Sequence, residues 1–240
     1  MKSIRSFDTQ DTMSDLIRQD FNILPVISRF SIPLGVGNRN IGEVCAQAGV
    51  NTHVFLLVVN FLLTGKMDMQ QVNVGDVSGI VDFLHNSHTY FLDYKFPHIR
   101  KNLESSLDPT HVDINPAIMK FYDDFVAQVK LHFAYEESTV FPYIRSLLKG
   151  EHSSYNISIF RQHHDEVAVK LTELKNIILL YYTTTKPDQM YDALVDIFNC
   201  EEDLESHSDI ENNILIPAIQ KVEQEKKQNT ENQNAHDGQL

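Results

Sequence analysis

Apolar residues recur every three or four positions along most of this chain, which is the spacing of an amphipathic helix. Four long segments carry such an apolar line, and they cover residues 76–103, 116–148, 156–182 and 188–223. Helices that are apolar on one face bury that face against one another. The pattern therefore predicts an all-α protein built on an up-down four-helix bundle, which we expect to span residues 74–223.

The first part of the chain, residues 1–66, predicts a separate and smaller helical domain. Asn40 is a candidate N-cap with Glu43 three residues later, which is the arrangement of a capping box. Gly49 and Gly65 stand where two helices are expected to end, because glycine readily takes the left-handed conformation found there. These signals predict several short helices.

Two polar segments flank the predicted bundle. Residues 66–73 are expected to link it to the N-terminal domain. Residues 224–240 show no apolar periodicity and are rich in Gln, Glu, Lys and Asn, so they predict a solvated, disordered tail.

Charge and hydropathy limit the partners of the protein. The 240 residues carry a formal net charge of −13 and no stripe of Lys and Arg, which disfavours a nucleic-acid-binding surface. The longest apolar run, residues 54–63, is shorter than the roughly 20 residues that span a bilayer. The N-terminus lacks the apolar region of a signal peptide. We therefore expect a soluble, cytoplasmic protein with no nucleic-acid or membrane partner.

Polar residues interrupt the apolar lines in a repeated motif. The pattern H-x-x-x-E-x-x-x-x-x-P occurs at residues 132–142 and again at 207–217. A histidine and a glutamate four residues apart share one face of a helix. A single such pair is most often solvated, but both pairs here lie within a core stripe. A third proline, Pro97, follows a similar local sequence, and each of the three is expected to interrupt its helix.

The other two long helices each offer one inward histidine. His88 is at the centre of the first apolar line, with His85 as the alternative, and His164 is in the third line. Glu137 should point away from Glu136 by about 100°, so we expect it to be solvated.

The chemistry of these side chains predicts a metal centre. Buried carboxylates are costly unless they are paired or bind a metal. Imidazole and carboxylate ligands suit iron, manganese or zinc, and six ligands suit two adjacent metals better than one tetrahedral zinc. The two cysteines, Cys45 and Cys200, lie outside any C-x-x-C motif and predict no cysteine site. We favour two irons bridged by Glu136 and Glu211, and the candidate ligands are His88, His132, Glu136, His164, His207 and Glu211.

The assembled pattern resembles the repair-of-iron-centres family, hemerythrin-like di-iron proteins associated with iron–sulfur cluster repair after nitrosative or oxidative stress. The similar segments are HFAYEESTVFP (132–142), HDE (164–166), HSDIENNILIP (207–217) and IGEVCAQAG (41–49). The resemblance implies a hemerythrin-like bundle in which two irons are bound by His132, Glu136, His164, His207 and Glu211.

The chain departs from this family at two places. Members often carry an adjacent histidine pair on the first helix, where this chain has His88-Thr89, so His85 or a shift of one residue stays open. Many members carry a Cys-Cys pair in the N-terminal loop, where this chain has Leu34-Gly-Val-Gly. Any thiol chemistry of the family is therefore in doubt here.

Two functions fit the predicted centre. The first is a stress-response protein that binds or reduces nitric oxide or oxygen, or donates iron to damaged clusters in iron–sulfur client proteins. The second is a reversible oxygen or nitric oxide binder or sensor without turnover. A metal-free helical interaction module fits less well, because six inward polar groups would then lack partners. The sequence leaves nitric oxide reductase activity and a homodimer open.

Overall fold

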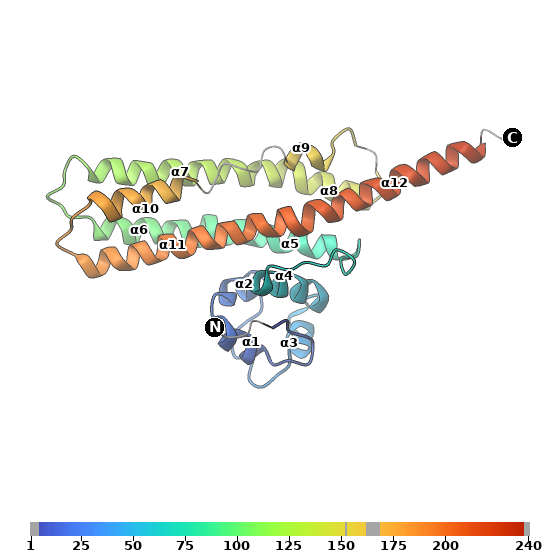
Figure 1. Ribbon diagram of the computed structural model, residues 1–240, viewed down its shortest axis with the longest axis horizontal. Coiled ribbons are helices and arrows are strands. Elements are labelled where there is room, and N and C mark those ends of the chain that lie inside the picture. The colour runs from blue at the N-terminus through green and yellow to red at the C-terminus, as the bar shows by residue number, and fades with distance from the viewer. Residues whose placement is uncertain (1–4, 152, 162–168, 238–240) are drawn as a thin grey trace. The chain divides into compact units, whose positions relative to one another are not determined.

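The structure, a computed structural model, describes residues 5–151, 153–161 and 169–237, and every regular element in these ranges is a helix (Figure 1). The expected all-α fold is confirmed. Along the chain the elements are α1 (Met13–Gln19), α2 (Ile23–Arg29), α3 (Ile41–Ala48), α4 (Thr52–Thr64), α5 (Asp76–Thr89), η1 (Tyr90–Lys95), α6 (Phe96–Ser106), α7 (Asn115–Tyr135), η2 (Glu136–Val140), α8 (Phe141–Leu148), α9 (Ile157–Arg161), α10 (Val169–Tyr181), α11 (Pro187–Ile210), η3 (Glu211–Leu215) and α12 (Ile216–Asp237).

The short N-terminal helices begin and end at the residues that predict them. The Asn40 side chain accepts from the Glu43 N–H at 2.8 Å, and the Glu43 carboxylate accepts from the Asn40 N–H at 3.0 Å, so the capping box at the start of α3 is complete. Gly49 and Gly65 follow α3 and α4 with φ of 70° and 65°. Local sequence alone is therefore sufficient to fix these helix ends.

Contacts divide the chain into two compact units. One comprises Met1–Asn86, Tyr143–Ser158 and Asp209–Leu240, and the other comprises Ser87–Pro142 and Ile159–Ser208. The boundaries fall inside helices and not in linkers. The domains expected at 1–66 and 74–223 therefore remain a prediction, because this division follows packing and not chain segments.

In the first unit, α4 and α5 approach closely. At Gly79 of α5 a Cβ atom would lie 3.1 Å from a methyl carbon of Val54, a distance tighter than most Cβ contacts, so glycine favours this close approach. Near the end of α5, the Asn86 side chain donates to the Arg29 carbonyl at 2.8 Å. The N-terminal helices thus pack directly on the start of the first long helix.

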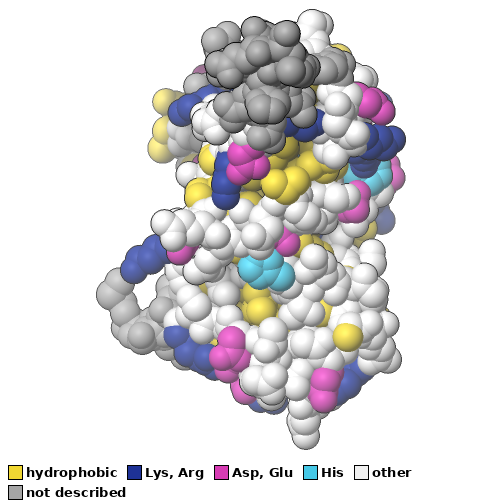
Figure 2. Space-filling model, turned by 90° about the vertical axis from the view of Figure 1, so that its right-hand side faces the viewer, with side chains coloured by type: hydrophobic (Ala, Val, Ile, Leu, Met, Phe, Trp, Pro, Cys, Tyr) yellow, Lys and Arg dark blue, Asp and Glu magenta, His cyan; other side chains and the backbone are white. Residues whose placement is uncertain are grey.

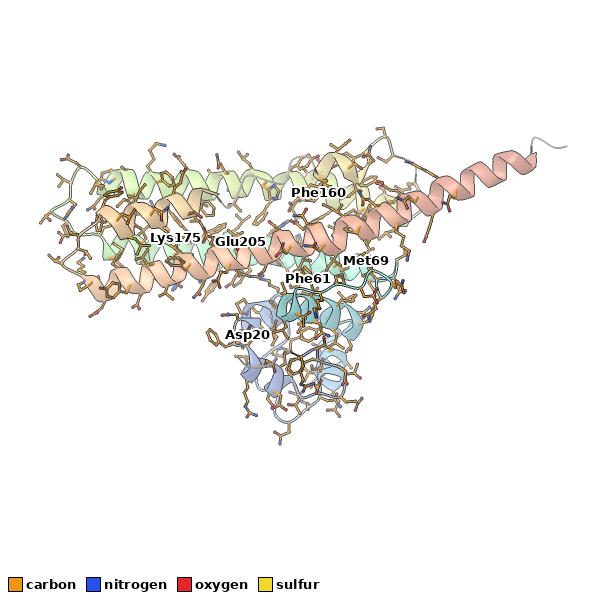
Figure 3. All side chains as sticks on the ribbon, in the orientation of Figure 1. Asp20, Phe61, Met69, Phe160, Lys175 and Glu205 are labelled. Carbon is orange, nitrogen blue, oxygen red and sulfur yellow. The ribbon has the colours of Figure 1, made fainter. Side chains whose placement is uncertain are left out.

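In the second unit, α6, α7, α10 and α11 surround one apolar core (Figure 1). The buried Tyr122 donates its hydroxyl hydrogen to the Phe96 carbonyl at 2.9 Å, which satisfies the polar atom of a large core side chain. Lys175 of α10, labelled in Figure 3, forms a buried ion pair with Glu201 of α11, and Thr172 donates to the same carboxylate at 2.7 Å. The core of this unit is therefore apolar, and the buried charges of Lys175 and Glu201 neutralise each other.

Three π turns precede the three prolines of the repeated pattern. In η2 the Phe141 N–H bonds to the Glu136 carbonyl, five residues back, and in η3 the Ile216 N–H bonds to the Glu211 carbonyl in the same way. Because the residue before each proline donates to the fifth residue back, the missing proline N–H is tolerated. The α-helical hydrogen bonding is thus interrupted before each proline, but the helical course is not broken, because the next helix follows each π turn directly.

The C-terminal segment is helical over most of its length. Helix α12 continues to Asp237, through much of the segment for which the sequence predicts a disordered tail. Glu, Lys and Gln are good helix formers even without an apolar face.

No helix in the described residues is long and apolar enough to cross a membrane. On the face drawn in Figure 2, Lys and Arg side chains lie among Asp and Glu side chains and form no continuous stripe.

Candidate metal centre

Four of the six predicted ligands form one buried group. His88 lies near the end of α5 and His207 near the end of α11, while Glu136 and Glu211 are the first residues of the π turns η2 and η3. Their relative exposures are 3% and 1% for the histidines and 0% for both glutamates. One ligand atom from each residue lies within 4.8 Å of the others. A single cation or a close pair of cations could contact all four.

Glu136 lies between two histidines from different helices. Its Oε2 is 2.8 Å from Nε2 of His88, and its Oε1 is 2.7 Å from Nε2 of His132. The second contact is the predicted pairing of residues four apart on one helical face. One carboxylate therefore presents each of its oxygens to a different imidazole.

Aromatic rings enclose this group. The His88 ring stacks on Phe133 with centroids 4.0 Å apart and on Phe141 with centroids 5.4 Å apart. The Phe133 ring also lies 5.4 Å from that of His207. Phe160 of α9, labelled in Figure 3, stacks 6.4 Å from the ring of His132. These rings pack against the imidazoles and hold their planes in place.

Phe91 is a lining residue that the sequence reasoning missed. It precedes Pro97 by six residues, as Glu136 precedes Pro142 and Glu211 precedes Pro217. Phe91 is fully buried, and the centroid of its ring lies 6.1 Å from that of His207. Alignment of the three proline patterns could have identified it. The first long helix thus supplies an aromatic wall where the other two supply carboxylates.

Glu137 is the second missed residue. Its Oε1 lies 2.7 Å from Nδ1 of His88, although the sequence predicts a solvated side chain that points away from the site. The π turn that begins at Glu136 has more residues per turn than an α-helix, so successive side chains are closer in direction. The repeated acid in His-x-x-x-Glu-Glu was the only signal available from sequence.

The remaining predicted ligands have different outcomes. His85 is exposed whereas His88 is buried, so the structure favours His88 on the first helix. His164 lies outside the described residues. His53 and His98, which the sequence pattern also leaves outside the inward positions, have side chains 47% and 46% exposed. The role of each predicted residue as a ligand remains a prediction.

A comparison with protein families matches residues 79–219 to the Hemerythrin HHE cation binding domain, more than half of the chain. The chain belongs to this hemerythrin family. It is accordingly a metal-binding, hemerythrin-like protein, and the domain typically binds iron. Searches of curated proteins and of solved structures found no match.

The residues present fit the metal of the hemerythrin family. Three imidazoles and two carboxylates, from His88, His132, His207, Glu136 and Glu211, are nitrogen and oxygen donors of the kind that iron accepts. The two carboxylates are fully buried, where an anionic charge is stabilised by a bound cation. The described residues therefore contain a donor set suited to iron without a thiolate.

Proposed function

We propose that this protein binds two irons, bridged by Glu136 and Glu211, and acts in iron–sulfur cluster repair under nitrosative or oxidative stress. The observation that carries the proposal is the buried group of two histidines and two glutamates with ligand atoms within 4.8 Å of one another. Two carboxylates and several imidazoles exceed the needs of one tetrahedral ion but suit a pair.

The chain's own residues have distinct roles in this proposal. Glu136 reaches one imidazole on α5 and one on α7, and Glu211 lies one turn from His207 on a continuous helix. The aromatic rings around His88 keep the group dry and its geometry fixed. When bound, two irons supply a centre that changes between ferrous and ferric states and offers open positions to a diatomic molecule.

The assignment to cluster repair is supported by two features. The chain belongs to the hemerythrin family, and it carries the repeated His-Glu-Pro motif together with an N-terminal segment similar to that of repair-of-iron-centres proteins. The proposed ligands are nitric oxide and oxygen, and the proposed clients are damaged iron–sulfur proteins. The proposal keeps the cytoplasmic setting expected from the sequence.

A reversible oxygen or nitric oxide binder is the second candidate. It is favoured by the burial of the group, because Glu136 and Glu211 are 0% exposed and aromatic rings surround the histidines. Reduction of nitric oxide to nitrous oxide consumes protons, and a dry pocket slows their delivery. A binder needs no such delivery.

One experiment separates the two candidates. Nitric oxide is added to the anaerobically iron-loaded, reduced protein, and nitrous oxide is measured alongside the visible spectrum, with metal-free protein as the control. Nitrous oxide above the control supports the reductive form of the repair proposal. A stable spectral adduct without product supports the binder. If neither nitrous oxide nor an adduct forms, nitric oxide is not the ligand in either candidate function.

A further inference from the structure

Glu137 contacts His88 but is not one of the four clustered residues His88, Glu136, His207 and Glu211. We propose that Glu137 is a positioning residue that orients His88 toward the metal, an inference that rests on the proposed di-iron function. His88 is the candidate ligand for which the sequence left two alternatives, so a residue that fixes its ring decides whether the first long helix takes part.

The His88 ring lies between two carboxylates. Its Nδ1 is 2.7 Å from Oε1 of Glu137, and its Nε2 is 2.8 Å from Oε2 of Glu136. Glu136 is fully buried, whereas the Glu137 side chain is 33% exposed. The two acids are neighbours in sequence, but one faces the metal group and the other lies between His88 and solvent.

The hydrogen bond from Nδ1 determines which nitrogen can bind a metal. An ionised carboxylate can only accept a hydrogen bond from Nδ1, so Nε2, which faces Glu136, is the nitrogen left for a metal. Stacking on Phe133 and Phe141, at interplanar angles of 18° and 7°, fixes the plane of the ring. The rings set the plane, and Glu137 sets which edge of the imidazole faces Glu136.

The second copy of the motif has an amide where the first has the Glu137 carboxylate. The residue after Glu211 is Asn212, an exposed amide without a formal charge. Both glutamates begin a π turn, so Glu137 and Asn212 occupy the same position of the turn in the two copies. A second acid follows the metal-facing glutamate only in the first copy, and we expect loss of Glu137 to weaken binding at the His88 side of the centre.

Anaerobic titration of the full-length protein with Fe²⁺ against a competing chelator tests this inference. Glu137→Ala removes the acceptor and should weaken Fe²⁺ binding about 10- to 100-fold, the usual effect of losing such a partner. Glu137→Gln keeps an acceptor oxygen and should lose less. Glu202→Ala removes the same charge from an exposed position of α11 and is the matched control, expected to bind as the wild type does. Equal affinity in wild type and Glu137→Ala would overturn the inference.

A second readout needs no metal. Nitrogen-15 NMR of the metal-free protein should show the His88 Nδ1–H proton shifted downfield and protected from exchange, because it is bonded to a carboxylate. That signal should vanish in Glu137→Ala and persist in Glu202→Ala. A wild type that binds no iron contradicts the di-iron function, whereas the same Nδ1–H signal in wild type and Glu137→Ala contradicts the role of Glu137.

Discussion

His85 and His88 lie on consecutive turns of α5, but only His88 is buried. The His88 ring contacts Glu136, whereas the His85 side chain is on the exposed face. We therefore predict that His88→Gln weakens Fe²⁺ binding at least about 10-fold, since a ligand should matter no less than its supporting residue. His85→Gln is the matched control and should leave affinity unchanged, as measured by chelator competition. The reverse result would reassign the ligand to His85.

Asp108 joins two loops of the second unit and predicts a pH dependence of stability. Thr185 and Thr110 each donate to its carboxylate through both a hydroxyl and a backbone N–H. These hydrogen bonds, that of the Thr185 hydroxyl first, hold the pKa of Asp108 well below its usual range. A lowered folded-state pKa contributes stability that is complete above the ordinary value of about 4 and is lost as pH falls below it.

We accordingly expect Asp108→Asn to lower the free energy of unfolding near pH 7, because the amide offers one acceptor oxygen where the carboxylate has two. The difference from wild type should shrink as pH falls below about 4. Urea unfolding at several pH values measures it. A difference that grew toward acidic pH would contradict this account of the carboxylate.

At the scale of single residues, sequence periodicity found the inward side chains and missed their neighbours. His88, Glu136, His207 and Glu211 are buried as their places in the apolar lines predict. Glu137 and Phe91 were missed for one physical reason. Ideal helical geometry at 100° per residue does not describe a π turn. Phe91 lies in η1 and Glu137 in η2, where the number of residues per turn is larger.

Among the structural elements, the helices and their ends follow from local signals. Asn40 caps the start of α3, and the left-handed residues Gly49 and Gly65 end α3 and α4, so the sequence predicts these three helix ends correctly. The π turns could not be predicted, because proline alone suggests a break, and their hydrogen bonds depend on neighbouring helices that hold the chain in line. The same limit applies to α12, whose extension to Asp237 has no apolar periodicity to predict it.

The π turn η2 supports a prediction about Pro142. An alanine there could donate its N–H to the carbonyl four residues back, so Pro142→Ala should favour an ordinary α-turn and displace Glu136 and Glu137 from His88. We expect weaker Fe²⁺ binding with unchanged helix content by circular dichroism. Pro116→Ala is the control, because this proline lies in the first turn of α7, where no N–H donor is needed. Equal loss of affinity in both variants would argue against a special role of η2.

At the scale of the whole molecule, the bundle brings together groups far apart in sequence. His88, Glu136 and His207 belong to three helices, and one helical face from each converges on the same point. The four apolar lines predicted this convergence, because a bundle has one interior. They predicted the contact of Glu136 with His132 on the same helical face, but not its contact with His88, since that depends on the relative axial positions of two helices.

The central claim is that the buried histidines and glutamates bind two irons, and the iron content of the protein tests it most directly. After anaerobic loading with Fe²⁺ and removal of excess metal, we expect about two irons per chain. The double variant Glu136→Gln with Glu211→Gln, which keeps side-chain size and removes both bridging charges, should retain less than one. Less than one iron per chain in the wild type, or full iron content in the double variant, would contradict the account.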